Sequence, residues 1–112
     1  MRVDKPWGHE IIWAQAENYC GKILHIERGQ ILSLQYHEKK HESIYVLSGK
    51  MIFRYEDAQK QLQERVMVSG EAQQVPTGRI HQFEAIDTTD VLEASTNHLD
   101  DVVRLKDRYG RV

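Results

Sequence analysis

Three side chains with the chemistry of metal ligands lie close together between Gly29 and Gly49, in the sequence GQILSLQYHEKKHESIYVLSG. Gln35 and His37 are two residues apart, so on a β-strand their side chains leave the same face. Glu42 follows a polar run that we interpret as a turn, and it precedes the apolar segment SIYVL. Two ligands from one strand and a third from the start of its neighbour can converge on one ion.

A fourth donor is His81, which lies downstream in VPTGRIHQF. Together Gln35, His37, Glu42 and His81 offer two imidazole nitrogens, an amide oxygen and a carboxylate, with no thiolate. This set predicts one divalent ion, with Zn²⁺ as first choice and Mn²⁺, Fe²⁺, Co²⁺ or Ni²⁺ as alternatives. A single histidine is more often a surface residue or a hydrogen-bonded core residue, and we assign the remaining ones to that class: His9, His25, His41 and His98.

The elements that would position these ligands are short strands. Apolar or alternating runs recur about every ten residues, and Gly, Pro, Asp or Ser residues separate them. One of them, residues 31–37, has an apolar face of Leu32, Leu34 and Tyr36, which we expect to pack in the core. Eight or more such strands predict an all-β sandwich or small barrel. The runs are 10–15, 19–27, 31–37, 43–55 (a hairpin around Gly49), 65–69, 71–75, 81–86 and 91–95.

The C-terminal tail is the one segment that we predict to be helical. Between Asp100 and Tyr109, four apolar residues would form a narrow stripe on a short helix: Val102, Val103, Leu105 and Tyr109.

Length and composition predict a single domain, residues 1–112, of a cytoplasmic protein. The net charge of −2 gives no reason to expect nucleic acid or an anionic membrane as partner. The only cysteine, Cys20, excludes an internal disulfide and favours a reducing compartment. No apolar stretch approaches the roughly 20 residues of a membrane span.

Two runs with fixed internal spacing carry a family resemblance. The run G-x5-QYH-x4-E-x6-G, from Gly29 to Gly49, resembles the first cupin motif, with Gln35 where the family usually has histidine. The run G-x5-PTG-x2-H, from Gly70 to His81, resembles the second motif. This likeness implies a cupin-type double-stranded β-helix, a jelly-roll barrel, in which the short helical tail would follow the last strand.

Four further segments narrow the resemblance to the cupin domain of type II mannose-6-phosphate isomerases, where glutamine also replaces the first histidine. In that group the domain often follows a mannose-1-phosphate guanylyltransferase domain, which this sequence lacks. The likeness implies that Gln35, His37, Glu42 and His81 are the metal ligands, and that the chain forms a homodimer. The departures are EKKH at 38–41, in place of a His-rich run with arginine, and Ser43 in place of histidine. The four segments are KPWG (5–8), GQILSLQ (29–35), DDVVRL (100–105) and DRYGR (107–111).

Isomerisation of an aldose to a ketose needs a base, a Lewis acid and cationic groups for the phosphate. Glu93 and Lys22 are our candidates for proton transfer, although each is equally well explained as half of a buried ion pair. Phe83 is in phase with His81 and is expected to line the same cavity. The substrate-binding candidates are Lys40, Phe83, Arg104, Arg108 and Arg111, and the three arginines are also explained as solvated or packing residues.

These features support three functional hypotheses. The first is a metal-dependent sugar-phosphate isomerase that interconverts mannose 6-phosphate and fructose 6-phosphate through an enediol. The second is a non-catalytic cupin module that binds a sugar or another metabolite. The third is another metal-dependent cupin enzyme, such as an iron oxygenase, although Gln35 argues against it because oxygen chemistry generally uses more imidazole.

Overall fold

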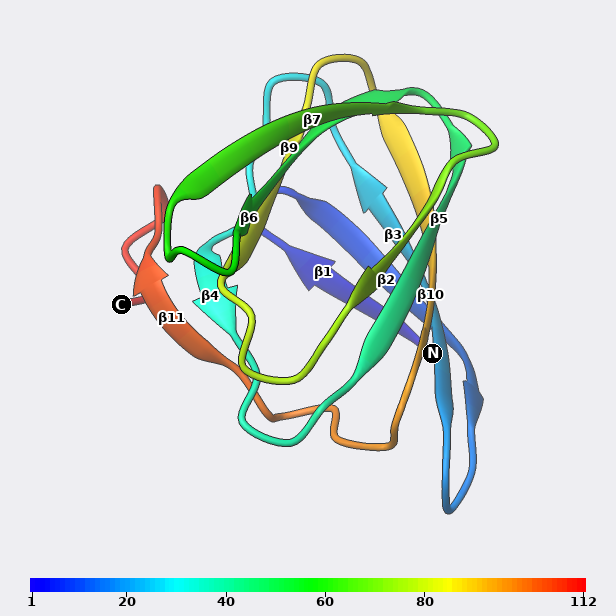
Figure 1. Cartoon of the computed structure of the whole chain (residues 1–112). Coiled ribbons are helices and arrows are strands. Elements are labelled where there is room, and N and C mark those ends of the chain that lie inside the picture. Colours follow the sequence, from blue (N-terminus) through cyan, green and yellow to red (C-terminus); the bar gives the residue numbers. More distant parts are fainter.

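Two antiparallel sheets face each other in the computed structural model, which describes residues 1–112 (Figure 1). All the regular elements are strands, and no helix is present that could cross a membrane. The six-stranded sheet contains, in order, β1 (Arg2–Lys5), β2 (Gly8–Gln15), β3 (Cys20–Ile26), β10 (Thr89–Ser95), β5 (Glu42–Ser48) and β8 (Ala72–Val75). The five-stranded sheet contains β11 (Val103–Lys106), β4 (Leu34–Tyr36), β9 (His81–Ala85), β6 (Lys50–Glu56) and β7 (Leu62–Val68).

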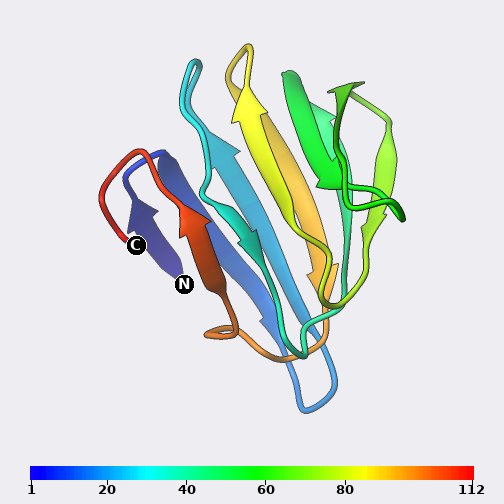
Figure 2. The ribbon, with the colours of Figure 1, turned by 60° about the vertical axis from the view of Figure 1, so that its left-hand side comes forward.

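The strand order is that of a jelly roll, because successive parts of the chain cross between the sheets instead of forming one meander. The last long strand, β10, lies between β3 and β5, and the edge strands β1 and β11 lie on the same side of the barrel (Figure 2). The predicted all-β class and the cupin-type barrel are therefore confirmed.

The space between the sheets holds one hydrophobic cluster, and the period of two along each strand builds it. On β5, for example, Ile44 and Val46 are buried while Tyr45 is exposed. Glu42 lies in phase with the buried residues, so this strand also points a carboxylate into the barrel. The cluster consists of Trp7, Leu24, Ile26, Leu32, Ile44, Val46, Met51, Phe53, Met67, Val75, Phe83, Ala85 and Val91.

The hairpin predicted around Gly49 is wrong, because β5 and β6 follow each other across a tight turn but belong to different sheets and do not pair. The turn itself requires Gly49. Its φ of +95° lies in the left-handed region, and a Cβ at this position would collide with the carbonyl oxygen of Thr88. The turn carries the chain from β5 in the six-stranded sheet to β6 in the five-stranded sheet.

The predicted helix between Asp100 and Tyr109 is wrong. Residues 103–106 form β11 instead, which pairs antiparallel with β4 so that Val103 faces Tyr36 and Arg104 faces Gln35. The short strand β4 would otherwise leave its backbone N–H and C=O groups unpaired at the sheet edge, and pairing with the tail satisfies them. This tertiary interaction outweighs the weak helical stripe, which contains two β-branched valines.

The orientation predicted for residues 31–37 is partly wrong as well. Leu32 is in the core, but Leu34 and Tyr36 are only half-buried, whereas Ser33 and His37 are 1% and 3% exposed. The three residues of β4, Leu34–Tyr36, are all half-buried, so the expected alternation is absent there. Beyond that point the interior of the barrel is a polar cavity, so the polar side chains turn inward.

An apolar row crosses the outer face of the six-stranded sheet. Ile11, Ile23, Leu92 and Tyr45 are neighbours in register on β2, β3, β10 and β5. Ile11 is 37% exposed and Tyr45 is 42% exposed, so a band of apolar surface remains open to solvent.

Candidate metal centre

His37, Glu42 and His81 converge inside the barrel from three different places in the chain. The Oε1 atom of Glu42 lies 3.4 Å from Nε2 of His37 and 3.3 Å from Nε2 of His81. One ligand atom from each of the three residues lies within 4.8 Å of the others. Glu42 begins β5, His81 begins β9 and His37 follows β4, so rigid strands fix all three positions.

Hydrogen bonds to the backbone orient both imidazole rings. The Nδ1 atom of His37 lies 2.5 Å from the carbonyl oxygen of Asp101, and Nδ1 of His81 lies 2.8 Å from that of Arg79. A carbonyl only accepts, so the proton of each neutral ring is on Nδ1 and a lone pair remains on Nε2. Both Nε2 atoms are buried without a hydrogen-bond partner. Two lone pairs and a carboxylate therefore face one point, which is costly unless a cation lies between them.

The donor set fits a divalent metal. Ligand atoms about 2.0–2.1 Å from a tetrahedral Zn²⁺ lie about 3.3 Å from each other, which matches the two separations from Glu42. Hydrogen bonds from Nδ1 to carbonyl oxygens are also the usual way in which proteins orient metal-binding histidines. His37, Glu42 and His81 could thus hold one metal ion.

The fourth predicted ligand, Gln35, lines the same cavity and pairs in register with His81 across β4 and β9. Its Oε1 atom accepts a hydrogen bond of 2.6 Å from the hydroxyl of Ser33. An amide oxygen has two lone pairs, so this bond orients Gln35 and leaves one lone pair for an ion.

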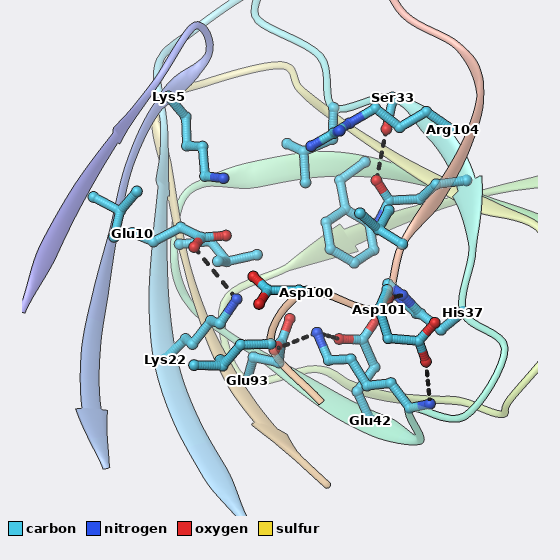
Figure 3. A pocket seen from close by; sticks show the side chains of 18 of the residues that line it. Lys5, Glu10, Lys22, Ser33, His37, Glu42, Glu93, Asp100, Asp101 and Arg104 are labelled. Atoms are coloured by element: carbon cyan, nitrogen blue, oxygen red, sulfur yellow. Dashed lines mark hydrogen bonds and ion pairs between the residues drawn. The ribbon is translucent and has the colours of Figure 1, made fainter. Parts of the chain in front are cut away.

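The cavity beside the cluster has a volume of about 250 Å³ and extends between the two sheets (Figure 3). The apolar part of the cavity wall consists of side chains that include Trp7, Leu24 and Phe83. The volume is at the small end of the range for small-molecule pockets, roughly 300–1,000 Å³, and fits a ligand of monosaccharide size. Phe83 also packs its ring 5.8 Å from that of His81.

Lys40 links Glu42 to a second buried carboxylate, Glu93. Its Nζ atom lies 3.3 Å from Oε2 of Glu42 and 3.0 Å from Oε2 of Glu93, and all three side chains are almost fully buried. Burial alone would lower the pKa of Lys40, but the two carboxylates outweigh it and raise that pKa. Lys40 is therefore a charged part of the cavity wall.

The pKa values of the two carboxylates next to Lys40 are shifted in opposite directions. Burial opposes ionisation of Glu42, but the neighbouring imidazoles of His37 and His81 and the charge of Lys40 outweigh it and hold the pKa of Glu42 well below its usual value. Burial, followed by the charge of Glu42, raises the pKa of Glu93 to about 8. Glu42 thus stays ionised, while the ionised form of Glu93 is disfavoured by its surroundings.

Lys22 and Glu93 are neighbours in register on β3 and β10, and both line the cavity. The Nζ atom of Lys22 lies 3.3 Å from Oε1 of Glu10 on β2. Both proton-transfer candidates therefore lie in the cavity wall, on the side opposite His81 and β9.

The three arginines of the tail have different surroundings. Arg104 and Arg111 line the cavity, but Arg111 is held by two hydrogen bonds of 2.8 Å to the carboxylate of Asp107. Arg108 is exposed outside the cavity, where it donates 2.8 Å to the carbonyl oxygen of Gly29.

The departures from the type II isomerase pattern lie mostly outside the cavity. Within the run 38–41 only Lys40 is buried, and its neighbours are exposed. Ser43 is exposed and alternates with the inward-facing Glu42 and Ile44 on β5. A histidine at position 43 would point away from the cavity, so its replacement leaves the site intact.

Several cavity residues were missed by the sequence analysis. Lys5, Ser33 and Asp100 line the cavity, and Asp101 holds the loop that carries Lys40. Lys5 and both aspartates belong to the segments KPWG and DDVVRL, which carry the family resemblance. Their presence there was the available signal, but a motif does not say which way a side chain points.

Asp101 ties the tail to the metal cluster. Its carboxylate accepts hydrogen bonds from the backbone N–H groups of Glu38, Lys39 and Lys40, at 3.0, 2.7 and 2.8 Å. Burial works to raise its pKa, but these three bonds outweigh it and lower the pKa of Asp101 to about 2. The same residue orients His37 through its own carbonyl oxygen.

We expect Asp101→Asn to weaken metal binding by roughly 10–100-fold, the usual effect of disturbing a group that orients a ligand. An amide NH₂ would face N–H donors, and His37 would lose its fixed support. The metal-free wild-type protein should also lose stability as pH falls from about 4 through about 2, because the pKa of Asp101 is depressed in the folded state.

Metal titration and urea unfolding of both proteins, at pH 6 and at pH 2.5, check this expectation. The stability difference between them should shrink at the lower pH. Equal metal affinities, or a difference in stability that does not depend on pH, would contradict the role assigned to Asp101.

Comparison with known proteins agrees with this geometry. The family model described as "Mannose-6-phosphate isomerase C-terminal" matches residues 1–107. The chain is 32% identical to the mannose-1-phosphate guanylyltransferase ManC of Salmonella typhimurium and 31% identical to a mannose-1-phosphate guanylyltransferase of Escherichia coli K12. Each match covers 98% of this chain but only 23% of the relative, so the chain spans about a quarter of these proteins' length.

Solved structures share the fold at lower identity. KdgF from Halomonas sp. superposes with a TM-score of 0.77 at 19% identity, covering 89% of this chain and 88% of that one. A variant of Bacillus subtilis oxalate decarboxylase gives a TM-score of 0.82 at 16% identity, covering all of this chain and 32% of that one. These proteins are cupins. With the family model matching nearly the whole length, this chain belongs to the family of mannose-6-phosphate isomerase C-terminal domains and has the cupin fold.

Proposed function

We propose that this protein is a metal-dependent sugar-phosphate isomerase that interconverts mannose 6-phosphate and fructose 6-phosphate. The observation that carries the proposal is one small cavity in which the His37–Glu42–His81 cluster adjoins the buried Glu93. The choice of substrate rests on the family, whose description names mannose-6-phosphate isomerase.

His37, Glu42 and His81, with Gln35 as fourth ligand, would hold the metal, for which we propose Zn²⁺. Such an ion supplies a Lewis acid that polarises the sugar carbonyl and orients the neighbouring oxygen. With Glu42 as the only charged ligand, the centre keeps a net positive charge, which favours sugar oxygens over apolar ligands.

Glu93 is proposed to move the proton between the two carbons. In its ionised form it would take the proton from C2 of the aldose and return it to C1 of the enediol, while a hydroxyl proton passes from O2 to O1. Lys40, 3.0 Å away, and Lys22, on the neighbouring strand, carry positive charges that stabilise this ionised form. Lys22 is also placed to donate a hydrogen bond to a sugar oxygen.

A coupled assay with mannose 6-phosphate, on protein whose metal content is known from elemental analysis, tests the proposal. We expect turnover that a chelator removes and that added Zn²⁺ or Mn²⁺ restores. Protein with one metal ion per chain that isomerises no hexose phosphate would refute it. Consumption of oxygen that depends on Fe²⁺ would instead favour an oxygenase.

A non-catalytic sugar-binding module is the second candidate. It is favoured by the curated relatives, which are named guanylyltransferases and of which the chain spans only about a quarter. In that case the chain would bind sugar phosphate with metal present and release it unchanged.

We also propose that residues 1–112 act as one domain in the cytoplasm and pair with a second copy through the outer apolar row. Cys20 is free and buried, which is compatible with a reducing compartment. A two-fold axis through the row would cover Ile23, Leu92 and Tyr45 with the same residues of the partner copy, as an isologous interface requires.

Leu92→Arg should convert the dimer to a monomer in sedimentation velocity, because it would bury an unpaired charge at the centre of that contact. The matched control is Leu62→Arg, at a 53% exposed position on β7 in the other sheet. A wild-type monomer, or an L92R protein that stays dimeric, would contradict this interface.

A further inference from the structure

The cavity is lined by five cationic side chains, and three of them are already paired. Lys22 lies against Glu10, Lys40 lies between Glu42 and Glu93, and Arg111 is bound to Asp107. The two that remain are Lys5 and Arg104, for which the structure contains neither an ion pair nor a side-chain hydrogen bond. The Nε atom of Arg104 is buried without any partner. An unpaired cation inside a cavity is costly, and a bound anion would offset that cost.

The two cations belong to the edge strands on the same side of the barrel. Lys5 ends β1, at the edge of the six-stranded sheet, and Arg104 lies on β11, at the edge of the five-stranded sheet. In Figure 3 both side chains enter the cavity from opposite sides, away from Glu42 and Glu93. The cavity therefore has a cationic end at the edge strands and a metal-binding end at β5 and β9.

Register shows how the two ends are connected. Across the five-stranded sheet, Arg104 pairs with Gln35 on β4, and Gln35 pairs with His81 on β9. A ligand that lies along this row would reach from the guanidinium to the metal cluster. Asp100 is the one cavity carboxylate with neither an ion pair nor a hydrogen bond, since Asp101 is held by backbone N–H groups. The oxygens of Asp100 point into the cavity between the two ends in Figure 3, where they can accept hydrogen bonds from hydroxyl groups.

We propose that Lys5 and Arg104 form a phosphate-monoester site, which holds the phosphate at the edge strands and directs the opposite end of the sugar to the metal cluster. The inference rests on the proposed isomerase function and deepens it by assigning the phosphate to these two residues. A guanidinium and an ammonium are the groups that proteins use for phosphate, because they donate charge-assisted hydrogen bonds to its oxygens. The pair makes the phosphate, and not the sugar hydroxyls, the main determinant of affinity.

Lys5→Met and Arg104→Met are each expected to weaken binding of mannose 6-phosphate by roughly 10–100-fold, the range for one charge-assisted hydrogen bond lost. Binding of unphosphorylated mannose and of the metal ion should stay the same, because neither uses the edge-strand end. In kinetics the KM should rise much more than kcat falls. Arg104→Lys, which keeps the charge, should recover part of the affinity.

Matched controls remove one cation from the same strands outside the cavity. Arg2→Met on β1 and Lys106→Met on β11 both lie at exposed positions, and both variants should bind the sugar phosphate as the wild type does. Circular dichroism of each variant verifies that the β fold is kept.

Isothermal titration with mannose 6-phosphate, mannose and inorganic phosphate separates this inference from the isomerase proposal. Phosphate binding that depends on Lys5 and Arg104, without any turnover, would support the site and refute the isomerase. Turnover by wild type, together with K5M and R104M proteins that bind mannose 6-phosphate as tightly as the R2M and K106M controls, would refute the phosphate site alone.

Discussion

Replacing His37 or His81 with alanine is expected to abolish stoichiometric metal binding and to reduce isomerisation by more than about 100-fold. Each change removes one of the two imidazole nitrogens that face Glu42 Oε1 at 3.3–3.4 Å, and the ion would keep at most three of its four ligands. Loss of a direct ligand should exceed the roughly 10–100-fold effect of disturbing the groups behind it. Elemental analysis and the coupled assay measure both losses.

The fold should survive both substitutions, because in the metal-free protein the Nε2 atoms make no hydrogen bond. A useful second readout is the rise in thermal midpoint when metal is added, since a ligand stabilises the folded state that binds it. Wild type should show this rise and H37A and H81A should not. His41→Ala, at an exposed position in the neighbouring loop, is the matched control and should behave as wild type. Full metal content in both cavity variants would show that the metal site lies elsewhere.

Glu93→Gln is expected to lower kcat by about 10²–10⁴-fold while the metal stays bound, because an amide cannot accept the C2 proton. Glutamine has nearly the same shape as glutamate, and Lys40 keeps its contact with Glu42, so the cavity should stay intact. Loss of deuterium from C2-labelled mannose 6-phosphate to solvent reports the proton transfer directly. That exchange should stop in E93Q even where substrate binding is normal.

A matched control and a conservative variant accompany Glu93→Gln. Glu64→Gln removes a carboxylate from an exposed position on β7 and should leave kcat unchanged. Glu93→Asp keeps the carboxylate but shortens it, so it should fall between wild type and E93Q. If E93Q retains activity within a few-fold of wild type, Glu93 is a structural ion-pair residue and another group is the base.

The convergence of His37, Glu42 and His81 is the part of the candidate site that the sequence predicts, for a physical reason. Residues two apart on a strand share a face, so the extended backbone of β4 directs the side chains of Gln35 and His37 to the same side. Glu42 and His81 are each the first residue of a strand, and the turn before each strand fixes the position of that residue. Such local rules need no knowledge of the partner strands.

Long-range pairing is where the same approach fails. The local stripe of the tail predicts a helix, and only the open edge of β4 makes Val103 and Arg104 part of a strand. Lys5 carries no local signal for a similar reason, since its position in the cavity follows from where β1 and β11 lie in the barrel and not from its neighbours in sequence. Likewise, position 43 looked like a functional departure until alternation along β5 turned Ser43 outward.

The hydrogen bond from His37 to the carbonyl oxygen of Asp101 spans 64 residues of sequence. During synthesis the ligands His37, Glu42 and His81 all leave the ribosome before the residue that orients His37. Until the tail has been made and lies against β4, the proposed ligand His37 therefore lacks the hydrogen bond that orients its ring. The orientation of His37, and with it the proposed metal site, is thus complete only in a barrel whose tail lies against β4.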